Sequence, residues 1–291
     1  MIPEAFEYLA PKTIPEAISY LQQYGDDAKI LSGGHSLIPM LKLRLASLSH
    51  IVDINGISGM EYIEEKEGYL KIGGLTREAE LEDSDLIRGK YPIIFDTAKM
   101  IADPQVRNMA TLGGNLAHGD PANDHPATML ALKAQVVATG PKGKRTISID
   151  DFFISLFETA LTADEILTEI QIPIQNAGSS GAYLKLERKV GDFATAGVAA
   201  QVTLDKKGVC QSAGIGLTNA GHVPIRVSEA EDLLTGQKPD ENLIKQAAQL
   251  AEDVADPSED LRGSVEYKKA MIKELTKRAL TLAFERAKGG H

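Results

Sequence analysis

Residues 28–38 read AKILSGGHSLI and residues 111–115 read TLGGN, and these two stretches decide the interpretation of the chain. The apolar run Ala28–Leu31 predicts a strand that leads directly into a Gly-Gly pair. Glycine lacks Cβ, so the backbone can approach an anion closely and direct its N–H groups at it. Two such loops indicate a long anion held at two places, for instance the pyrophosphate of a dinucleotide. The alternative for each loop is a plain turn.

Around these loops the spacing of apolar residues predicts a mixture of helices and short strands. Residues 15–24 have helical spacing and residues 50–54 read as a strand, so the first 55 residues form a small α/β unit. The segment NAGSSG at 176–181 is the candidate linker, with a boundary near residue 178. Further strands are expected at 69–72, 134–139, 145–149, 166–172, 183–186, 197–204 and 212–217, and helices at 93–101, 243–254 and 271–282.

Charge and cysteine content argue against several classes of protein. The chain has 291 residues with 31 Lys+Arg and 41 Asp+Glu, a formal net charge of −10, which disfavours nucleic acid as a partner. No stretch reaches the roughly 18 apolar residues of a transmembrane helix. Cys210 alone cannot hold an iron–sulfur cluster, which needs about four protein ligands. The N-terminus carries Glu and Pro where a secretory peptide has an apolar run, so a cytoplasmic location is expected.

The familiar nucleotide and catalytic motifs are missing from the sequence. There is no G-x-G-x-x-G after a strand and no G-x-x-x-x-G-K-[ST], which argues against a Rossmann NAD site and against an ATPase. No catalytic triad is visible, and no catalytic residue is predicted.

The segment HGDPANDH at 118–125 looks like a metal cluster and leaves a metal-dependent hydrolase as an alternative. Pro121 and Pro126 keep the segment irregular, so the helical spacing of metal ligands does not apply. Asp120 and Asp124 can instead cap turns or the helix expected near Ala127. No metal site is therefore predicted.

Two longer motifs carry a resemblance to a known family. Residues 32–44 (SGGHSLIPMLKLR) and 111–124 (TLGGNLAHGDPAND) together strongly resemble the FAD-binding medium subunits of molybdenum hydroxylases, most closely those of aerobic carbon monoxide dehydrogenases. The resemblance covers nearly the whole chain and includes Ile2-Pro3, residues 188–196 and Glu266-Tyr267.

This resemblance implies an α+β chain with the FAD-binding fold of the vanillyl-alcohol-oxidase type. Residues 1–56 are expected to form an N-terminal α/β FAD-binding subdomain, and residues 57–177 a middle FAD-binding subdomain with an antiparallel sheet. Residues 178–291 are expected to form a C-terminal domain with a three-stranded sheet and a helical bundle. FAD is expected between the first two units.

The resemblance also implies which residues bind FAD. The two loops are expected to hold the pyrophosphate, and Asp124 to be a polar contact. Phe193 is expected beside the isoalloxazine ring, with a core residue at a strand start as the alternative. The predicted FAD-binding residues are Leu31, Ser32, Gly33, Gly34, His35, Ser36, Leu37, Ile38, Ile101, Thr111, Leu112, Gly113, Gly114, Asn115, Asp124, Leu167, Lys185 and Phe193.

The implied function is that of an electron-transfer subunit. It would accept electrons from the [2Fe-2S] clusters of a small subunit, next to a large subunit with the molybdenum cofactor, and pass them to an acceptor such as a quinone. The expected assembly is a dimer of heterotrimers. Alternatives are the medium subunit of an aldehyde or N-heterocycle hydroxylase, resembling xanthine dehydrogenase, or a stand-alone FAD reductase of the enolpyruvyl reductase type.

Overall fold

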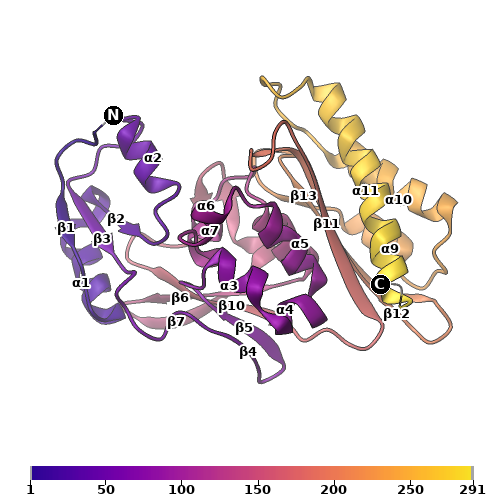
Figure 1. The fold of residues 1–291 in the computed structure, drawn as a ribbon, viewed down its shortest axis with the longest axis horizontal. Coiled ribbons are helices and arrows are strands. Elements are labelled where there is room, and N and C mark those ends of the chain that lie inside the picture. The colour runs from indigo at the N-terminus through magenta and orange to yellow at the C-terminus, as the bar shows by residue number, and fades with distance from the viewer. Residues whose placement is uncertain (1, 290–291) are drawn as a thin grey trace.

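The computed structural model describes residues 2–289, which are built around three larger sheets (Figure 1). The first sheet is parallel, in the order β1 (Glu7–Leu9), β3 (His50–Asp53), β2 (Ala28–Leu31). The helix α1 (Ile14–Tyr24) packs Ala17, Ile18 and Leu21 into the core of this unit. The Thr13 hydroxyl accepts a hydrogen bond from the Glu16 N–H and caps the start of α1. The helix and the two strands predicted within the first 55 residues are present.

The first strand, β1, was not expected from the sequence. It has three residues, too few to show the alternation of a half-buried strand. It forms because Glu7–Leu9 pair in parallel with His50–Val52 of β3. Two 3₁₀ turns, Gly25–Asp27 and Ile149–Asp151, were also not expected.

The middle sheet has five antiparallel strands and carries short helices on one face (Figure 1). The expected hairpin is β6 and β7, and the strand expected before Pro173 is the central strand β10. In sheet order the strands are β4 (Ile63–Lys66), β5 (Tyr69–Gly73), β10 (Ile166–Pro173), β6 (Gln135–Gly140) and β7 (Gly143–Ser148). The helices are α3 (Glu78–Asp83), α4 (Asp85–Lys90), α5 (Pro92–Met100), α6 (Pro104–Arg107), α7 (Leu112–Ala117) and α8 (His125–Ala131). A separate two-stranded hairpin joins β8 (Phe153–Ser155) to β9 (Glu158–Thr159).

The third sheet is antiparallel and stands between two layers of helices (Figure 1). Its strands are β11 (Ser179–Glu187), β12 (Ala194–Leu204), β13 (Cys210–Thr218) and β14 (Ile225–Arg226). The helices α5 and α8 contact it on one side, and α9 (Ser228–Leu234), α10 (Glu241–Val254) and α11 (Val265–Ala287) form the C-terminal layer. The expected three strands are present, and the two-residue β14 adds a fourth by pairing with Gly216 and Leu217.

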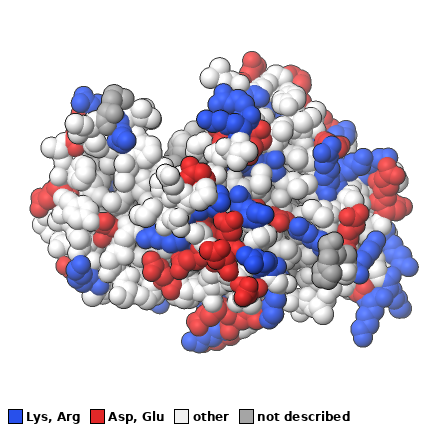
Figure 2. Space-filling model, in the orientation of Figure 1, with Lys and Arg blue, Asp and Glu red and all other residues white. Residues whose placement is uncertain are grey.

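The predicted linker is partly wrong, because Ser179–Gly181 belong to β11. These residues pair with Gln201–Thr203 of β12, and pairing overrides the low strand preference of Ser and Gly. Among residues 2–289, no helix is long and apolar enough to span a membrane. On the face shown in Figure 2, acidic and basic side chains are interspersed, with no uniformly basic surface.

Candidate functional site

The first glycine loop connects β2 to the short helix α2 (Leu37–Lys42). Gly34 has φ 81°, a conformation that side chains with a Cβ resist. A Cβ on Gly33 would overlap the carbonyl oxygen of Met109. The loop therefore packs directly against the chain that enters the second glycine loop.

The second loop begins the helix α7 and is joined to the first loop. Thr111 Oγ1 accepts a hydrogen bond from Gly114 N at 3.1 Å and caps α7. The same oxygen lies 2.7 Å from Ser32 Oγ of the first loop. A Cβ on Gly113 would overlap the carbonyl oxygen of Gly74, so this loop too is pressed against neighbouring backbone.

Two side chains that the sequence did not single out support the joined loops. The Asn55 side-chain amide donates to Ser32 O at 2.7 Å, and Arg77 Nη2 donates to Asn55 Oδ1 at 2.8 Å. Arg77 also donates to Met109 O. Asn55-Gly56 shows only a turn signal in the sequence, because its role depends on contacts across the chain.

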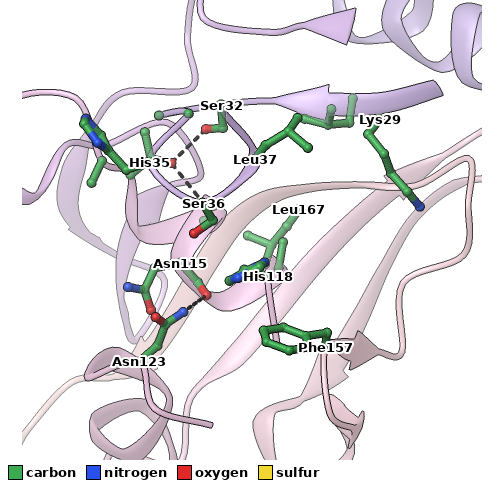
Figure 3. Close-up of a pocket in the computed structure, with 18 of the residues that line it drawn as sticks. Lys29, Ser32, His35, Ser36, Leu37, Asn115, His118, Asn123, Phe157 and Leu167 are labelled. Carbon is green, nitrogen blue, oxygen red and sulfur yellow. Dashed lines mark hydrogen bonds between the residues drawn. The ribbon is translucent and has the colours of Figure 1, made fainter. Parts of the chain in front are cut away.

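A cavity of about 750 Å³ lies along the two loops and extends to the C-terminal sheet. Figure 3 shows Ser32, Ser36 and Asn115 around one part of it, with His118 and Phe157 side by side. Most predicted site residues line this cavity, namely Ser32, Gly33, Gly34, His35, Ser36, Leu37, Ile101, Thr111, Gly113, Gly114, Asn115, Asp124, Leu167, Lys185 and Phe193.

Three predicted residues are not among those that line the cavity. Leu112 is fully buried in the core, and Leu31 lies beneath the loop, where a Cβ on Gly34 would meet its Cδ1. Ile38 lines a second, separate hollow, together with Pro39 and Leu43. Helical and strand geometry explains this result, since neighbouring residues in a regular segment cannot all face one side.

At the far end of the cavity Asp124 and Lys185 form a buried ion pair. Lys185 Nζ lies 3.0 Å from Asp124 Oδ2 and donates to Met100 O at 2.9 Å. Burial raises the pKa of the Asp124 carboxyl, while the Lys185 charge and the hydroxyl of Tyr183 oppose this shift. This end of the cavity therefore offers an ion pair that is fixed by the hydroxyl of Tyr183 and the carbonyl oxygen of Met100.

His118 and Phe157 lie at another part of the cavity and were not predicted as ligand contacts. Their ring centroids are 5.1 Å apart. Burial lowers the pKa of His118. Phe157 comes from the β8–β9 hairpin, and its place beside His118 could be found only from the fold, because the two are far apart in the sequence.

The residues present fit an elongated anionic cofactor with a ring system. A volume of about 750 Å³ lies within the range of roughly 300–1,000 Å³ usual for ligand pockets. Asn115 Oδ1 is buried without a hydrogen-bond partner among residues 2–289, so this polar atom beside the loops is left for a ligand. The two glycine pairs provide backbone that an anion can approach.

The polar residues of HGDPANDH do not gather around one point. Asp120 accepts a hydrogen bond from Ala122 N, Asp124 pairs with Lys185, and His125 Nε2 lies 2.6 Å from Glu78 Oε2 in the core. Within the described range, 2–289, no group of three or more His, Cys, Asp or Glu side chains is arranged to hold a metal ion.

Comparison with known families places the chain in a class. Residues 4–175 match the family described as the FAD binding domain in molybdopterin dehydrogenase, and residues 181–283 match the CO dehydrogenase flavoprotein C-terminal domain. The chain belongs to this family of FAD-binding oxidoreductase subunits, and its cofactor is FAD.

The chain is also similar to individual proteins along almost its whole length. The chain is 44% identical to the carbon monoxide dehydrogenase medium chain of Hydrogenophaga pseudoflava, over 98% of this chain and 99% of that one. It is 37% identical to the 6-hydroxypseudooxynicotine dehydrogenase complex subunit alpha of Paenarthrobacter nicotinovorans, over 99% and 97%.

Solved structures of similar proteins have the same fold as this chain. The structure of carbon monoxide dehydrogenase from H. pseudoflava superimposes with a TM-score of 0.96 at 44% identity, covering 98% of this chain and 99% of the other. Quinoline 2-oxidoreductase from Pseudomonas putida gives 0.91 at 31% identity, covering 99% of each chain. The expected fold class and the expected family are confirmed.

Proposed function

We propose that FAD lies in this cavity, with its pyrophosphate between the loops 32–36 and 111–115 and its ring system toward Lys185 and Phe193. The observation that carries this proposal is the joining of the two glycine loops along one cavity. The cavity is lined by the N-terminal unit and the middle unit, which supports FAD binding between residues 1–56 and residues 57–177. The third proposed unit, 178–291, contributes Lys185 and Phe193.

The chain's own residues bind and orient the cofactor. FAD, when bound, takes up electrons one at a time and stores two of them. The loops supply backbone N–H groups to the phosphates, and Lys185 presents a positive charge at the ring end. Phe193, half exposed, covers part of the opening. No residue of this chain needs to act as a catalytic acid or base.

The proposed role is that of the last electron carrier in a molybdenum hydroxylase. Electrons would come from the [2Fe-2S] clusters of a small subunit and leave to an external acceptor such as a quinone. Oxidation of the substrate would take place at the molybdenum site of a large subunit, within a cytoplasmic dimer of heterotrimers. The 44% identity to a carbon monoxide dehydrogenase medium chain favours carbon monoxide as the substrate of the complex. The 37% identity to a subunit of a dehydrogenase named for an N-heterocyclic compound keeps that class of substrate as the alternative.

An anaerobic reduction experiment tests this role. The chain, isolated with its partners, is mixed in turn with carbon monoxide, an aldehyde and an N-heterocycle while flavin absorbance is followed. We expect one substrate, carbon monoxide first, to bleach the flavin in the complex, and none to bleach the flavin of the isolated chain. Bleaching of the isolated chain by NADPH would instead identify a stand-alone reductase.

A further inference from the structure

The strand β11 presents three polar residues in alternation next to the Lys185 end of the cavity. Tyr183, Lys185 and Glu187 share one face of the strand, because side chains alternate along it. Tyr183 Oη donates to Asp124 Oδ1 at 2.5 Å, while Lys185 Nζ donates to the other oxygen, Asp124 Oδ2. Tyr183 is 2% exposed and is not among the residues that line the cavity. It reaches the site only through Asp124.

The ammonium group of Lys185 has two fixed acceptors and one loose one. An ammonium has three N–H donors. Two are taken by Asp124 Oδ2 at 3.0 Å and Met100 O at 2.9 Å. The third faces Glu187 Oε2 at 3.4 Å, and this oxygen has no hydrogen-bond partner within residues 2–289. The third donor has only this longer contact, so it is the donor left for a ligand in the cavity that Lys185 lines, and the position of the ammonium group depends on the two fixed acceptors.

The sheet leaves room for the Tyr183 hydroxyl. Gly197 on the neighbouring strand β12 pairs with Lys185, and a Cβ at Gly197 would lie 2.6 Å from Tyr183 Oη. The hydroxyl also lies 3.3 Å from Thr218 Oγ1 on β13, a residue that does not line the cavity. Of the two contacts of the hydroxyl, the one with Asp124 Oδ1 is the shorter and is made to a carboxylate.

We propose that Tyr183 is a positioning residue for the flavin site. Its hydroxyl holds the Asp124 carboxylate as the counter-ion of Lys185 and so fixes the ammonium group at the cavity wall. This inference rests on the proposed placement of the flavin ring at the Lys185 end.

The charged and hydrogen-bonding groups around Asp124 determine the direction in which loss of the Tyr183 hydroxyl should shift the flavin midpoint potential. Besides Lys185 and Tyr183, these are Glu187 on β11 and His125 on α8, which pairs with Glu78 on α3. Burial raises the pKa of Asp124, and the hydroxyl of Tyr183 opposes that shift. Without the hydroxyl, the pKa of Asp124 rises further and the neutral form of its carboxyl is more populated. The positive charge of Lys185 is then less compensated. A reduced, more negative flavin is then bound better relative to the oxidised one.

The test is the flavin midpoint potential of Tyr183→Phe in the full chain, measured by spectroelectrochemistry. We expect the ratio of affinities for reduced and oxidised FAD to rise about tenfold, a positive shift of about 30 mV for a two-electron couple. Tyr91→Phe is the matched control, since Tyr91 is 1% exposed and donates to a carboxylate, Glu65 Oε1, at 2.8 Å, away from the cavity. The control should leave the potential unchanged at a comparable loss of stability.

Two further variants separate the possible failures. Gly197→Ala should displace the hydroxyl without removing it, shift the potential in the same direction, and serve if Tyr183→Phe does not fold. Lys185→Met removes the positive charge and should shift the potential negatively. If Lys185→Met shifts the potential but the Tyr183 and Gly197 variants do not, Tyr183 has no positioning role, although the ring placement stands. If none of the three shifts it, the placement of the ring at this end is itself wrong.

Discussion

Phe193 lies at the opening of the proposed flavin site and is 51% exposed. The alternative of a core residue at a strand start is wrong, because β12 begins only at Ala194 and the ring remains half in solvent. Its backbone N–H donates to Asp192 Oδ1 at 2.9 Å, and Asp192 is held by Arg262 Nη2 at 2.8 Å. The ring is therefore carried on a segment tied to a distant part of the chain.

We expect Phe193→Ala to change flavin fluorescence and to speed reoxidation of the reduced flavin by oxygen. The physical reason is the loss of an aromatic cover, with stacking worth about 0.5–1.5 kcal/mol beyond its area burial. Stopped-flow reoxidation measures the effect. Identical spectra and rates in the folded variant would show that Phe193 does not contact the flavin.

His118 should make the protein sensitive to acid. Burial lowers its pKa in the folded state, so the unfolded chain binds the proton more readily. The contribution of neutral His118 to the free energy of unfolding is therefore complete above the pKa of this histidine in the unfolded chain, and it is lost as the pH falls below that value. His118→Phe should lose less stability than the wild type between about pH 7.5 and about pH 5.5, on either side of the ordinary histidine pKa of about 6.5. Urea unfolding at the two pH values checks this, and equal losses in both proteins would contradict it.

At the scale of elements, the close approach of α8 to β13 positions Asp124, the residue just before α8. A Cβ on Gly214 or Gly216 would overlap the carbonyl oxygens of Ala131 and Ala127, respectively. These glycines therefore set the distance between the helix and the sheet. That distance brings Asp124 within reach of Tyr183 and Lys185 on the neighbouring part of the same sheet.

Gly216→Ala should lower the stability of the chain and weaken FAD binding together. The overlap is with backbone, which cannot rotate away, so we expect a cost of about 1–3 kcal/mol, as in an overpacked core. Gly89→Ala is the control, because Gly89 lies in α4 and a Cβ there meets nothing within 4 Å. Thermal unfolding measures the stability, and a flavin titration measures the affinity for FAD. A destabilised variant with normal affinity for FAD would show that the position of α8 does not affect FAD binding.

The sequence predicts the longer elements well and the short ones poorly. The helix α1 and the strands β5 and β10 have clear apolar periodicity, and the hairpin of β6 and β7 is marked by its turn at residues 140–143. All five elements lie within a few residues of their predicted places. The strands β1, β8, β9 and β14 have two or three residues, and pairing alone creates them. The sequence likewise does not predict the roles of Asn55, Arg77 and Tyr183, because their contacts join segments 22 or more residues apart.

In the molecule as a whole, the three sheets bring segments that are far apart in the sequence to one cavity. Ser32 comes from the first sheet region, Thr111 from the middle unit and Lys185 from the third sheet. The Gly-Gly pairs indicate two anion loops, but the cavity that joins them to Lys185 and Phe193 exists only in the folded chain. Lys185 and Phe193 were predicted only through the resemblance to medium subunits. The structure was needed to show that Leu112, next to the glycine pair, points into the core and not into the cavity.

The FAD content of loop variants tests directly whether this cavity holds FAD. In Gly34→Val the new Cβ would lie 2.8 Å from Ile38 Cδ1 at φ 81°, and in Gly114→Val 2.7 Å from Thr111 Oγ1, so each distorts one loop. Strain of this kind costs about 1–3 kcal/mol. Gly208→Val, at φ 77° with open space around it, carries similar strain away from the cavity. We predict that FAD released by acid falls sharply in both loop variants and stays at one per chain in Gly208→Val. Full flavin in both folded loop variants would show that these loops do not bind FAD.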